Sequence, residues 1–270
     1  MKDKKYIIDH DYHIHSYISQ CSQDPTQNAE SILKYAIRNN LKSVALTDHF
    51  WDESVPGASK WYADNHTFAQ INAARPLPES NDVRFLFGCE ADMNKDCVLG
   101  ISPKLYDEFD FIVIATTHMH MTDFTVSKND QSDTKKLAQL WIDRINAVLN
   151  TPLPFYKVGL AHLMTRLIAL ENDRYIEVIN SITDEDYEDV FLRIAKVGAG
   201  VEINASEIKK MSDEGISAII RPYRIAKEMG CKFYIGSDAH SAKEFDAISY
   251  LPKFIDALEL TEDDKFHICS

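Results

Sequence analysis

Short apolar runs alternate with longer amphipathic segments along the whole chain. Each apolar run is rich in Val, Ile, Phe or Tyr, and several are apolar on both faces, which is typical of parallel strands covered by helices. We therefore expect seven strands, at residues 6–11, 43–47, 83–88, 109–116, 157–161, 200–203 and 232–236.

The segments between these runs repeat apolar residues at helical spacing. Leu137, Leu140 and Trp141, for example, would lie on one face of a helix. Gly198 and Gly230 each follow such a segment and are typical of residues that end helices. The spacing predicts helices at residues 26–39, 132–149, 184–197, 217–229 and 243–258.

Seven strands that alternate with helices predict an α/β fold with a parallel sheet. At 270 residues, a closed or nearly closed (β/α) barrel is the simplest architecture. No linker, low-complexity tract or repeat divides the chain, so we predict one domain, residues 1–270. Residues 50–65, which include Trp51, Trp61 and Tyr62, predict an irregular insertion after the second strand. This segment is either a self-packed surface loop or a lid over a substrate.

Composition and charge exclude several classes of protein. A hydrophobic content of 45% and an aromatic content of 10% are typical of a globular chain. The net charge of −13, without a cluster of Lys or Arg, predicts no nucleic-acid partner and no attraction to anionic membranes. No apolar run approaches the roughly 20 residues that span a bilayer. The five cysteines form no C-x-x-C pair, so we expect a cytoplasmic protein without a disulfide framework. The oligomeric state stays open.

Histidines gather at or just beyond the carboxyl ends of the predicted strands. In a parallel barrel these ends meet on one face, where such folds build active sites. A single histidine there is usually structural, but clustered imidazoles repel when protonated and gain little when neutral unless a cation lies between them. Glu90 and Asp238 occur at the same positions relative to the strands. The histidines of this set are His13, His15, His49, His118, His162 and His240.

Neutral imidazoles and carboxylates are the ligands that divalent transition metals prefer. His13 and His15 form an H-x-H pair whose side chains point to the same face of a strand, and Asp238 and His240 repeat the i, i+2 spacing. Eight candidate ligands exceed the three or four of one catalytic zinc. The sequence therefore predicts a cluster of two or three divalent metal ions, with the carboxylate of Glu90 as the natural bridge.

Four motifs in order resemble those of the PHP superfamily, named for polymerase and histidinol phosphatase domains. They are D-x-H-x-H-S at 11–16, T-D-H at 47–49, a glutamate motif at 88–90 and G-S-D-A-H at 236–240. His118 and His162, which lie between the third and fourth motifs, also fit the family. The chain length and the strand around Glu202 resemble the stand-alone histidinol-phosphatase branch of the family. No polymerase body is attached, which argues against a role as a proofreading domain.

The resemblance implies a distorted (β/α)7 TIM-like barrel that holds up to three ions of Zn, Fe or Mn at its carboxyl-terminal rim. It assigns His13, His15, Glu90 and Asp238 to a first ion, Glu90, His118 and His162 to a second, and His49 and His240 to a third. The third ion usually has one further histidine or aspartate shortly after H-x-H-S. Here only Cys21 or Asp24 is available, and Asp24 can instead cap the following turn.

The remaining histidines carry weaker signals. His120 lies two residues beyond His118, and we interpret it as a structural or supporting residue rather than a ligand. His10, His66 and His267 match no motif and are expected to be surface or packing residues.

A mechanism follows from the predicted cluster. Metal ions that Glu90 bridges would lower the pKa of bound water and would hold a phosphate for in-line attack. Asp238 would orient the attacking hydroxide, and His240 would assist the leaving group. Arg166 and Lys209, in loops beyond two strands, are candidate phosphate-binding cations.

The sequence thus favours a metal-dependent phosphomonoesterase that acts on a small phosphorylated metabolite. The resemblance makes L-histidinol phosphate the favoured substrate. A sugar phosphate, nucleotide or cyclic phosphate is the alternative for the same site. A non-catalytic, metal-binding regulatory protein is a third hypothesis, but it predicts missing ligands, and all eight are present.

Overall fold

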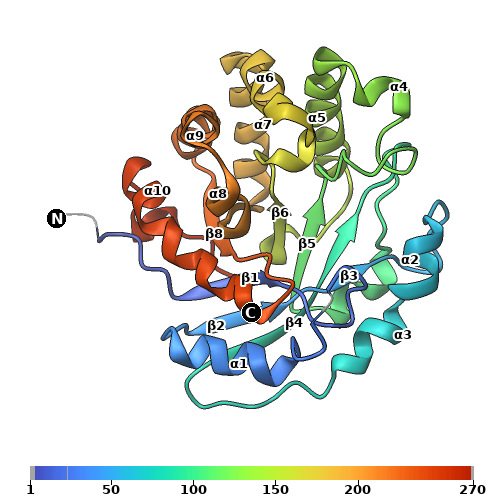
Figure 1. Ribbon diagram of the computed structural model, residues 1–270, viewed down its shortest axis with the longest axis vertical. Coiled ribbons are helices and arrows are strands. Elements are labelled where there is room, and N and C mark those ends of the chain that lie inside the picture. The colour runs from blue at the N-terminus through green and yellow to red at the C-terminus, as the bar shows by residue number, and fades with distance from the viewer. Residues whose placement is uncertain (1–3, 23, 269–270) are drawn as a thin grey trace.

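Parallel strands form the centre of the molecule, and the computed structural model describes residues 4–22 and 24–268. Within this part, seven strands follow one another around the sheet, and a short eighth strand, β3, pairs with β4 (Figure 1). Every strand pair of the sheet is parallel. The strands are β1 (His10–Ile14), β2 (Ser43–Leu46), β3 (His49–Phe50), β4 (Arg84–Asp92), β5 (Phe111–Ala115), β6 (Val158–Ala161), β7 (Gly200–Asn204) and β8 (Lys232–Gly236).

The sheet curls until its first and last strands meet. Ile14, at the end of β1, forms a parallel bridge with Ala239, which follows β8. The backbone N–H of Asp238 donates to the carbonyl of His13 at 2.7 Å. The result is a nearly closed parallel barrel, and the predicted distorted (β/α)7 TIM-like fold is confirmed.

Helices cover the outside of the barrel (Figure 1). Local signals in the sequence explain their ends: the Asn28 side chain caps the first helix by accepting from the N–H of Ser31, and Gly198 ends another with a φ of 80°. The helices are α1 (Ala29–Arg38), α2 (Lys60–Asn65), α3 (Phe68–Ile71), α4 (Lys128–Gln131), α5 (Thr134–Leu149), α6 (Arg174–Ser181), α7 (Asp184–Val197), α8 (Ala205–Lys210), α9 (Asp213–Glu228) and α10 (Leu251–Ala257).

An aromatic cluster fills the inside of the barrel. Tyr12 of β1, Phe111 of β5 and Tyr234 of β8 pack on one another, with centroid distances of 5.4 Å and 5.3 Å from the Phe111 ring to the two tyrosine rings. Gly159 of β6 leaves room for them, since a Cβ at this position would lie 2.5 Å from Tyr234 and 2.6 Å from Phe111. The barrel is therefore a packed core, and the polar residues are confined to its carboxyl-terminal end.

The structure corrects several predicted boundaries. The first strand begins at His10 rather than at residue 6, because residues 5 and 6 pair with the segment around Thr261 instead. The predicted helix at 243–258 is a 3₁₀ segment, Ala242–Tyr250, followed by α10. Residues 50–65 are not irregular throughout, because they begin in β3 and end in α2. Among the described residues, no helix is both long enough and apolar enough to cross a membrane.

Candidate metal centre

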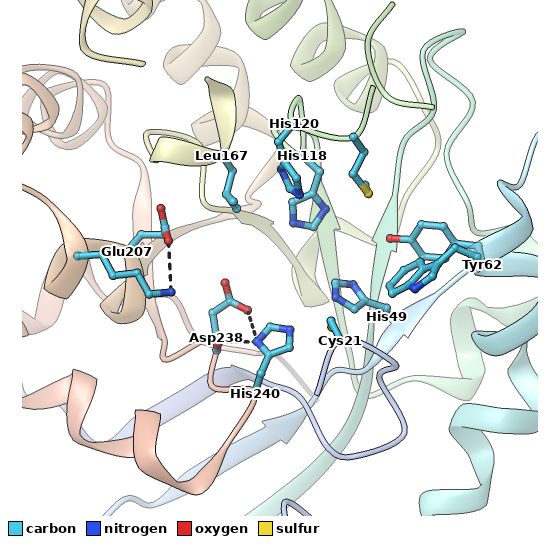
Figure 2. Close-up of a pocket in the computed structure, with 12 residues that line it drawn as sticks. Cys21, His49, Tyr62, His118, His120, Leu167, Glu207, Asp238 and His240 are labelled. Carbon is cyan, nitrogen blue, oxygen red and sulfur yellow. Dashed lines mark hydrogen bonds and ion pairs between the residues drawn. The ribbon is translucent and has the colours of Figure 1, made fainter. Parts of the chain in front are cut away.

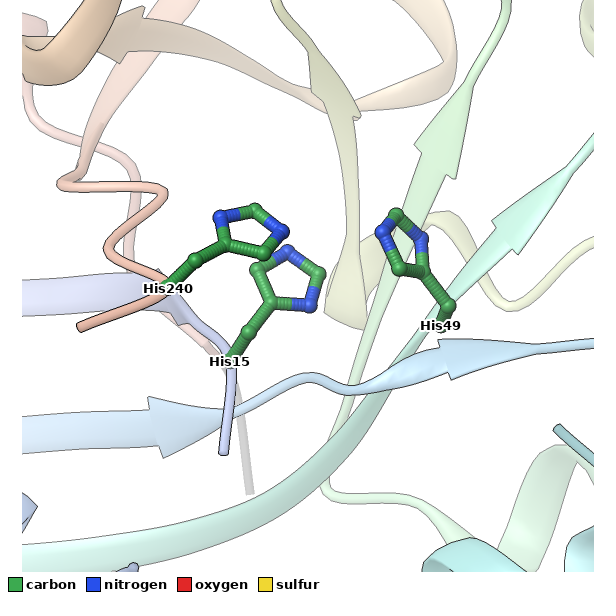
Figure 3. Close-up of side chains that lie close together, drawn as sticks. All are labelled: His15, His49 and His240. Carbon is green, nitrogen blue, oxygen red and sulfur yellow. The ribbon is translucent and has the colours of Figure 1, made fainter. Parts of the chain in front are cut away.

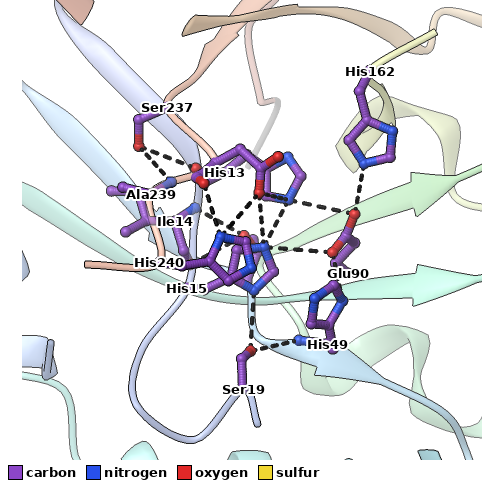
Figure 4. Close-up of polar contacts among 12 residues, drawn as sticks. His13, Ile14, His15, Ser19, His49, Glu90, His162, Ser237, Ala239 and His240 are labelled. Carbon is purple, nitrogen blue, oxygen red and sulfur yellow. Dashed lines mark hydrogen bonds and ion pairs between the residues drawn. The ribbon is translucent and has the colours of Figure 1, made fainter. Parts of the chain in front are cut away.

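The strand ends bring all eight predicted ligands to one end of the barrel. His13 lies in β1 and His15 follows it, His49 begins β3, and Glu90 lies in β4. The others follow the carboxyl ends of later strands: His118 after β5, His162 after β6, and Asp238 and His240 after β8. Figure 4 shows side chains of this cluster facing one another around Glu90.

The H-x-H pair has the predicted orientation. The Nε2 atoms of His13 and His15 lie 3.1 Å apart, so both rings point to the same side of β1. The Asp238 Oδ1 atom lies 3.6 Å from His13 Nε2 and 3.2 Å from His15 Nε2. These three side chains therefore present their ligand atoms to one point.

Glu90 is the hub of the cluster. It is 1% exposed, and Oε1 or Oε2 lies between 2.7 and 3.7 Å from a ring nitrogen of five histidines. Burial raises the pKa of this carboxyl group, but the nearby His49, His13 and His118 lower it more, so its pKa falls well below the usual range. The five histidines are His13, His15, His49, His118 and His162.

Hydrogen bonds behind the cluster fix which nitrogen of each ring carries a proton. The carboxylates of Glu202 and Asp92 lie 2.7 Å from Nδ1 of His13 and of His118, and a carbonyl oxygen lies 3.0 Å from Nδ1 of His240. Because these oxygens only accept, the proton of each ring must be on Nδ1. The Nε2 atoms of His13 and His118 face the inside of the cluster, 3.5 Å and 3.7 Å from Glu90 Oε1.

Two hydroxyl groups complete this pattern. Ser19 Oγ donates to Asp48, so it accepts from His15 Nδ1 at 3.1 Å. Thr117 Oγ1 donates to the carbonyl of His162 and accepts from the Nδ1 of the same residue at 2.9 Å. Such an orientation of the imidazole by a partner behind it is typical of histidines that bind metals.

The donor set fits divalent metal ions. Open Nε2 lone pairs that face one another, as in His13 and His15, repel unless a cation lies between them. His49 Nδ1 and Glu90 Oε2 are buried and 2.7 Å apart, so an imidazole nitrogen and a carboxylate oxygen meet inside the cluster. Three groups have ligand atoms within 4.8 Å of one another: His13, His15 and Asp238; His13, Glu90 and His162; and His15, His49 and His240 (Figure 3).

Backbone conformations at the site carry strain. Asp238 has a φ of 53° and His162 a φ of 36°, both in the left-handed region that non-glycine residues rarely adopt. Gly236 is required next to them, because a Cβ there would lie 2.0 Å from Glu202 Oε1. The fold thus supports a costly local geometry at two of the candidate ligands.

Of the two candidates for an additional ligand, only Cys21 lies in the cluster. Asp24 Oδ1 accepts from the N–H and hydroxyl of Thr26, so Asp24 caps the turn before α1. Cys21 lies beside His49 and His240 at the cavity (Figure 2). Burial raises the pKa of the Cys21 thiol, but His49 and His240 lower it more, to about 6.

A cavity of about 410 Å³ opens above the cluster. Tyr62 of α2 and Glu207 of α8 lie on opposite sides of it (Figure 2), and Trp61 of α2 and Lys210 of α8 also line it. The 50–65 segment therefore borders the cavity, whereas Trp51 of the same segment is buried, with 1% of its surface exposed. The complete lining is Cys21, His49, Trp61, Tyr62, His118, His120, Met121, Leu167, Glu207, Lys210, Asp238 and His240.

The two predicted phosphate-binding cations lie outside this lining. Arg166 lies 3.4 Å from the buried carboxylate of Glu207, and Lys209 donates to Asp246 at 2.7 Å on the surface. Lys210, the neighbour of Lys209, lines the cavity instead. Adjacent side chains of a helix point about 100° apart, and the sequence alone did not show which lysine faces inward.

His118 contacts Glu90 but belongs to none of the three groups, and the four histidines that were not predicted as ligands also lie outside them. His120 lines the cavity, and burial lowers its pKa to about 4, with a further contribution from His118. His66 is buried and accepts the N–H of Gln20 at 3.1 Å, and His10 is buried and accepts the N–H of Ile235 at 3.0 Å. His267 is exposed.

The supporting carboxylates were missed at the sequence level. Glu202, Asp92 and Asp48 are all buried. Glu202 contacts the ring of His13, Asp92 contacts the ring of His118, and Asp48 accepts from Ser19 in the turn after His15. A signal was available, because Glu202 is a charge inside an apolar strand and buried charges need partners. Asp92 also follows Glu90 by two residues, which places both on the same face of β4.

Comparison with known families identifies the chain. The model of the PHP domain matches residues 11–216, more than half of the sequence. The chain belongs to the PHP domain family. The first three motifs, at 11–16, 47–49 and 88–90, lie within the matched residues, and the predicted family is confirmed.

Curated relatives and solved structures agree with this assignment. The PHP chain is 28% identical to a probable phosphatase of Thermoanaerobacter sp. (strain X514) over 88% of its own length and 81% of the relative. It is 26% identical to a probable phosphatase of Aliivibrio fischeri (strain MJ11), with coverage of 94% and 86%.

Among solved structures, the histidinol phosphate phosphatase of Lactococcus lactis, complexed with zinc, L-histidinol and phosphate, has a TM-score of 0.53 at 15% identity. That match covers 97% of this chain and all of the neighbour. A candidate histidinol phosphatase of Listeria monocytogenes has a TM-score of 0.57 at 13% identity, with coverage of 87% and 96%. At these identities the likeness shows a shared fold.

Proposed function

We propose that this PHP domain is a metal-dependent phosphatase that hydrolyses a small phosphomonoester, with L-histidinol phosphate as the favoured substrate. One observation carries the proposal: open Nε2 atoms of several histidines converge with Glu90 and Asp238 on one side of a cavity. The curated relatives, which are probable phosphatases, support the same reaction class.

Divalent ions at this site would acidify bound water and polarise a phosphoryl group. The chain's own contribution is to hold them. Glu90 would hold ions together with the histidines on both sides of it, because its Oε1 lies 2.9 Å from His162 Nε2 and its Oε2 lies 3.4 Å from His15 Nε2. It would thereby set the spacing of the centre.

Asp238 and His240 would act on the substrate side of the centre. Asp238 Oδ2 accepts from the Asn204 side chain at 3.2 Å, which fixes the carboxylate where it can orient an attacking water. The His240 side chain is 27% exposed, and its Nε2 is open to the cavity. Through Nε2 it either donates a proton to the leaving oxygen or binds an ion, since one nitrogen cannot do both.

The cavity walls support a substrate with a planar ring and an amine. The aromatic faces of Trp61 and Tyr62 can pack against a ring such as imidazole. The Glu207 carboxylate lines the cavity in ion-pair contact with Arg166, at 3.4 Å, and Lys210, at 3.6 Å, and would offer negative charge to an ammonium group. The volume of about 410 Å³ suits a small metabolite.

Turnover of a phosphomonoester panel, with and without a chelator, tests the proposal. We expect chelator to abolish hydrolysis and added Zn²⁺, Fe²⁺ or Mn²⁺ to restore it. Hydrolysis that resists complete metal removal would overturn the metal mechanism. Activity on a sugar phosphate or nucleotide, with none on L-histidinol phosphate, would remove only the favoured substrate.

Glu90→Gln should reduce turnover by more than about 100-fold and lower the metal content, because the amide cannot bridge two ions as an anion. Glu185→Gln is the matched control, since Glu185 is exposed on α7, far from the cluster in sequence. Metal analysis and circular dichroism would be measured on both. A fully active Glu90→Gln variant would contradict the bridging role.

A further inference from the structure

A second cavity, of about 400 Å³, lies beside the first one, which opens above the candidate metal centre. It is formed by two segments that leave the barrel at candidate ligands, one after His118 and the other after His162. The later segment passes directly from one cavity to the other, since Leu167 lines the first and Ala169 lines the second. The two cavities are therefore neighbours at the same end of the barrel.

His120 connects the two cavities, because it belongs to the lining of both. Its ring lies next to that of the candidate ligand His118 (Figure 2), with a distance of 5.5 Å between the ring centroids. A molecule bound at His118 would thus enter the second cavity by passing the ring of His120. The second cavity is close enough to the metal centre to take another part of the same molecule.

Two cations line the second cavity without an ion-pair partner among the described residues. They are Lys128 of α4 and Arg174, the first residue of α6. Glu171, the acidic residue of the lining, is exposed, so the lining carries more positive than negative charge. The chain as a whole has 42 Asp and Glu against 29 Lys and Arg. The second cavity therefore departs from the charge balance of the molecule.

Hydrogen bonds hold the guanidinium group of Arg174 in place. Its Nη2 donates to the backbone carbonyl of Gln131, the last residue of α4. The Gln131 side chain donates to the carbonyl of Met119 at 3.0 Å and accepts from Thr122 Oγ1 at 2.7 Å. A guanidinium group has five N–H donors in one plane, so a single bond orients it and leaves donors that the protein does not use.

The chemistry of this lining matches an anionic group. A guanidinium group and an ammonium group both donate charge-assisted hydrogen bonds to the oxygens of a carboxylate or a phosphate. The metal centre would take the phosphate that is hydrolysed, so the anion in the second cavity has to be a different group. A substrate that spans both cavities would carry its reacting phosphate at one end and a second anionic group at the other.

We propose that the second cavity is a specificity subsite, in which Lys128 and Arg174 bind a second anionic group of the phosphomonoester that is hydrolysed at the metal centre. This group is a carboxylate or a phosphate. The inference rests on the proposed phosphatase function and extends its substrate class. L-Histidinol phosphate has no second anionic group and would occupy the first cavity alone.

Three six-carbon compounds test the second group. Glucose 6-phosphate has one anionic group, 6-phosphogluconate adds a carboxylate at the far end, and glucose 1,6-bisphosphate adds a phosphate there. We expect a lower KM for at least one of the latter two, by about fivefold or more. Phosphate release gives KM, and calorimetry gives Kd for any compound that is not hydrolysed. A gain for one compound alone identifies the anion that the subsite takes.

Lys128→Gln and Arg174→Gln should each remove most of this preference. The ratio of KM for glucose 6-phosphate to KM for the preferred compound should fall by about fivefold, toward one. Arg174→Lys, which keeps the charge but not the planar fork, should lose less. Lys128 is exposed, so its variant tests the subsite even if Arg174→Gln is unstable. Lys135→Gln is the matched control, because Lys135 is exposed on α5 and lines neither cavity.

The subsite and the phosphatase function fail in different ways. A wild type without preference, or a preference that Lys128→Gln and Arg174→Gln reduce no more than Lys135→Gln does, would overturn the subsite. Metal-dependent hydrolysis in the same experiment would leave the phosphatase function intact. A preference in Kd that both variants lose, in a protein that hydrolyses no phosphoester, would support the anion site and overturn the phosphatase function.

Discussion

At the scale of single residues, the candidate metal centre is determined by atoms behind the ligands. The sequence showed which residue types gather at the strand ends, and all eight predicted side chains lie there. It did not show the ring orientation, which depends on Glu202, Asp92, Ser19 and Thr117. Ser19 lies four residues from His15, but Glu202, Asp92 and Thr117 lie 189, 26 and 45 residues from the rings that they contact, so their pairing depends on the tertiary structure.

Asp92→Asn should weaken metal binding without removing a ligand. Asp92 Oδ2 lies 2.7 Å from His118 Nδ1 and accepts from Tyr62 Oη at 2.8 Å, so a neutral amide would make His118 a less basic donor. We expect metal affinity to fall by about 10- to 100-fold. Competition with a chromophoric chelator would measure the change. Tyr62→Phe is the control, and an equal loss in both variants would contradict the role assigned to the carboxylate.

Two adjacent lysines of α8 offer a matched pair for substrate binding. Lys210 lines the cavity, with its Nζ 3.6 Å from Glu207 Oε1, whereas Lys209 donates to Asp246 on the surface. We expect Lys210→Gln to raise KM for a phosphomonoester by about tenfold, equivalent to about 1.4 kcal/mol. Lys209→Gln carries the same change of charge and should alter KM less than about twofold. The reverse result would support the sequence-level assignment of Lys209.

At the scale of elements, periodic segments were predictable and short ones were not. The helix predicted at 184–197 matches α7 at both ends, because a cap, an acidic first turn and Gly198 mark it in the sequence. Helices α6 and α8 have eight and six residues, too few for their periodicity to be visible. The strand predicted at 6–11 was displaced because Tyr6 packs and pairs with the carboxyl-terminal segment.

Arg144 of α5 joins the ends of two strands and should be essential to stability. It is fully buried, and its guanidinium group donates to four backbone carbonyls, those of Met93, Asn94, Thr116 and Thr125. Arg144→Met would leave these carbonyls without their donor, so we expect the free energy of unfolding to fall by about 3–5 kcal/mol.

Denaturant unfolding would measure this effect against a control in α7. Arg193→Met also removes a guanidinium group, but Arg193 donates to the side chains of Asn146 and Asn150 at a more accessible position. This variant should lose less than about 1 kcal/mol. If both variants lost the same small amount of unfolding free energy, the hydrogen bonds from Arg144 to the four carbonyls would not be essential to stability.

At the scale of the whole molecule, the barrel explains why motifs spread over 230 residues identify one site. Residues 11–16 and 236–240 come from opposite ends of the sequence, and the contact between β1 and β8 brings them together. The order of the motifs therefore predicted both the fold and the site. The position of charge around the cavity was not predictable in the same way, because the net charge of −13 is distributed over the entire chain.

The net charge and the candidate site make opposite predictions for ionic strength. The overall charge of −13 would repel a phosphomonoester, so screening by salt would raise kcat/KM if the distant field were decisive. Divalent ions held at the candidate site, together with Lys210, would lie beside a bound phosphate, and salt would weaken that short-range attraction instead. We expect kcat/KM to fall several-fold between about 0.01 M and 0.1 M salt, as the Debye length shrinks from about 30 Å to about 10 Å.

The measurement needs two salts with different anions, so that competition of the anion for the metal centre is separated from screening of charge. An increase of kcat/KM in both salts would show that the surface charge, and not the cavity, controls the approach of the substrate.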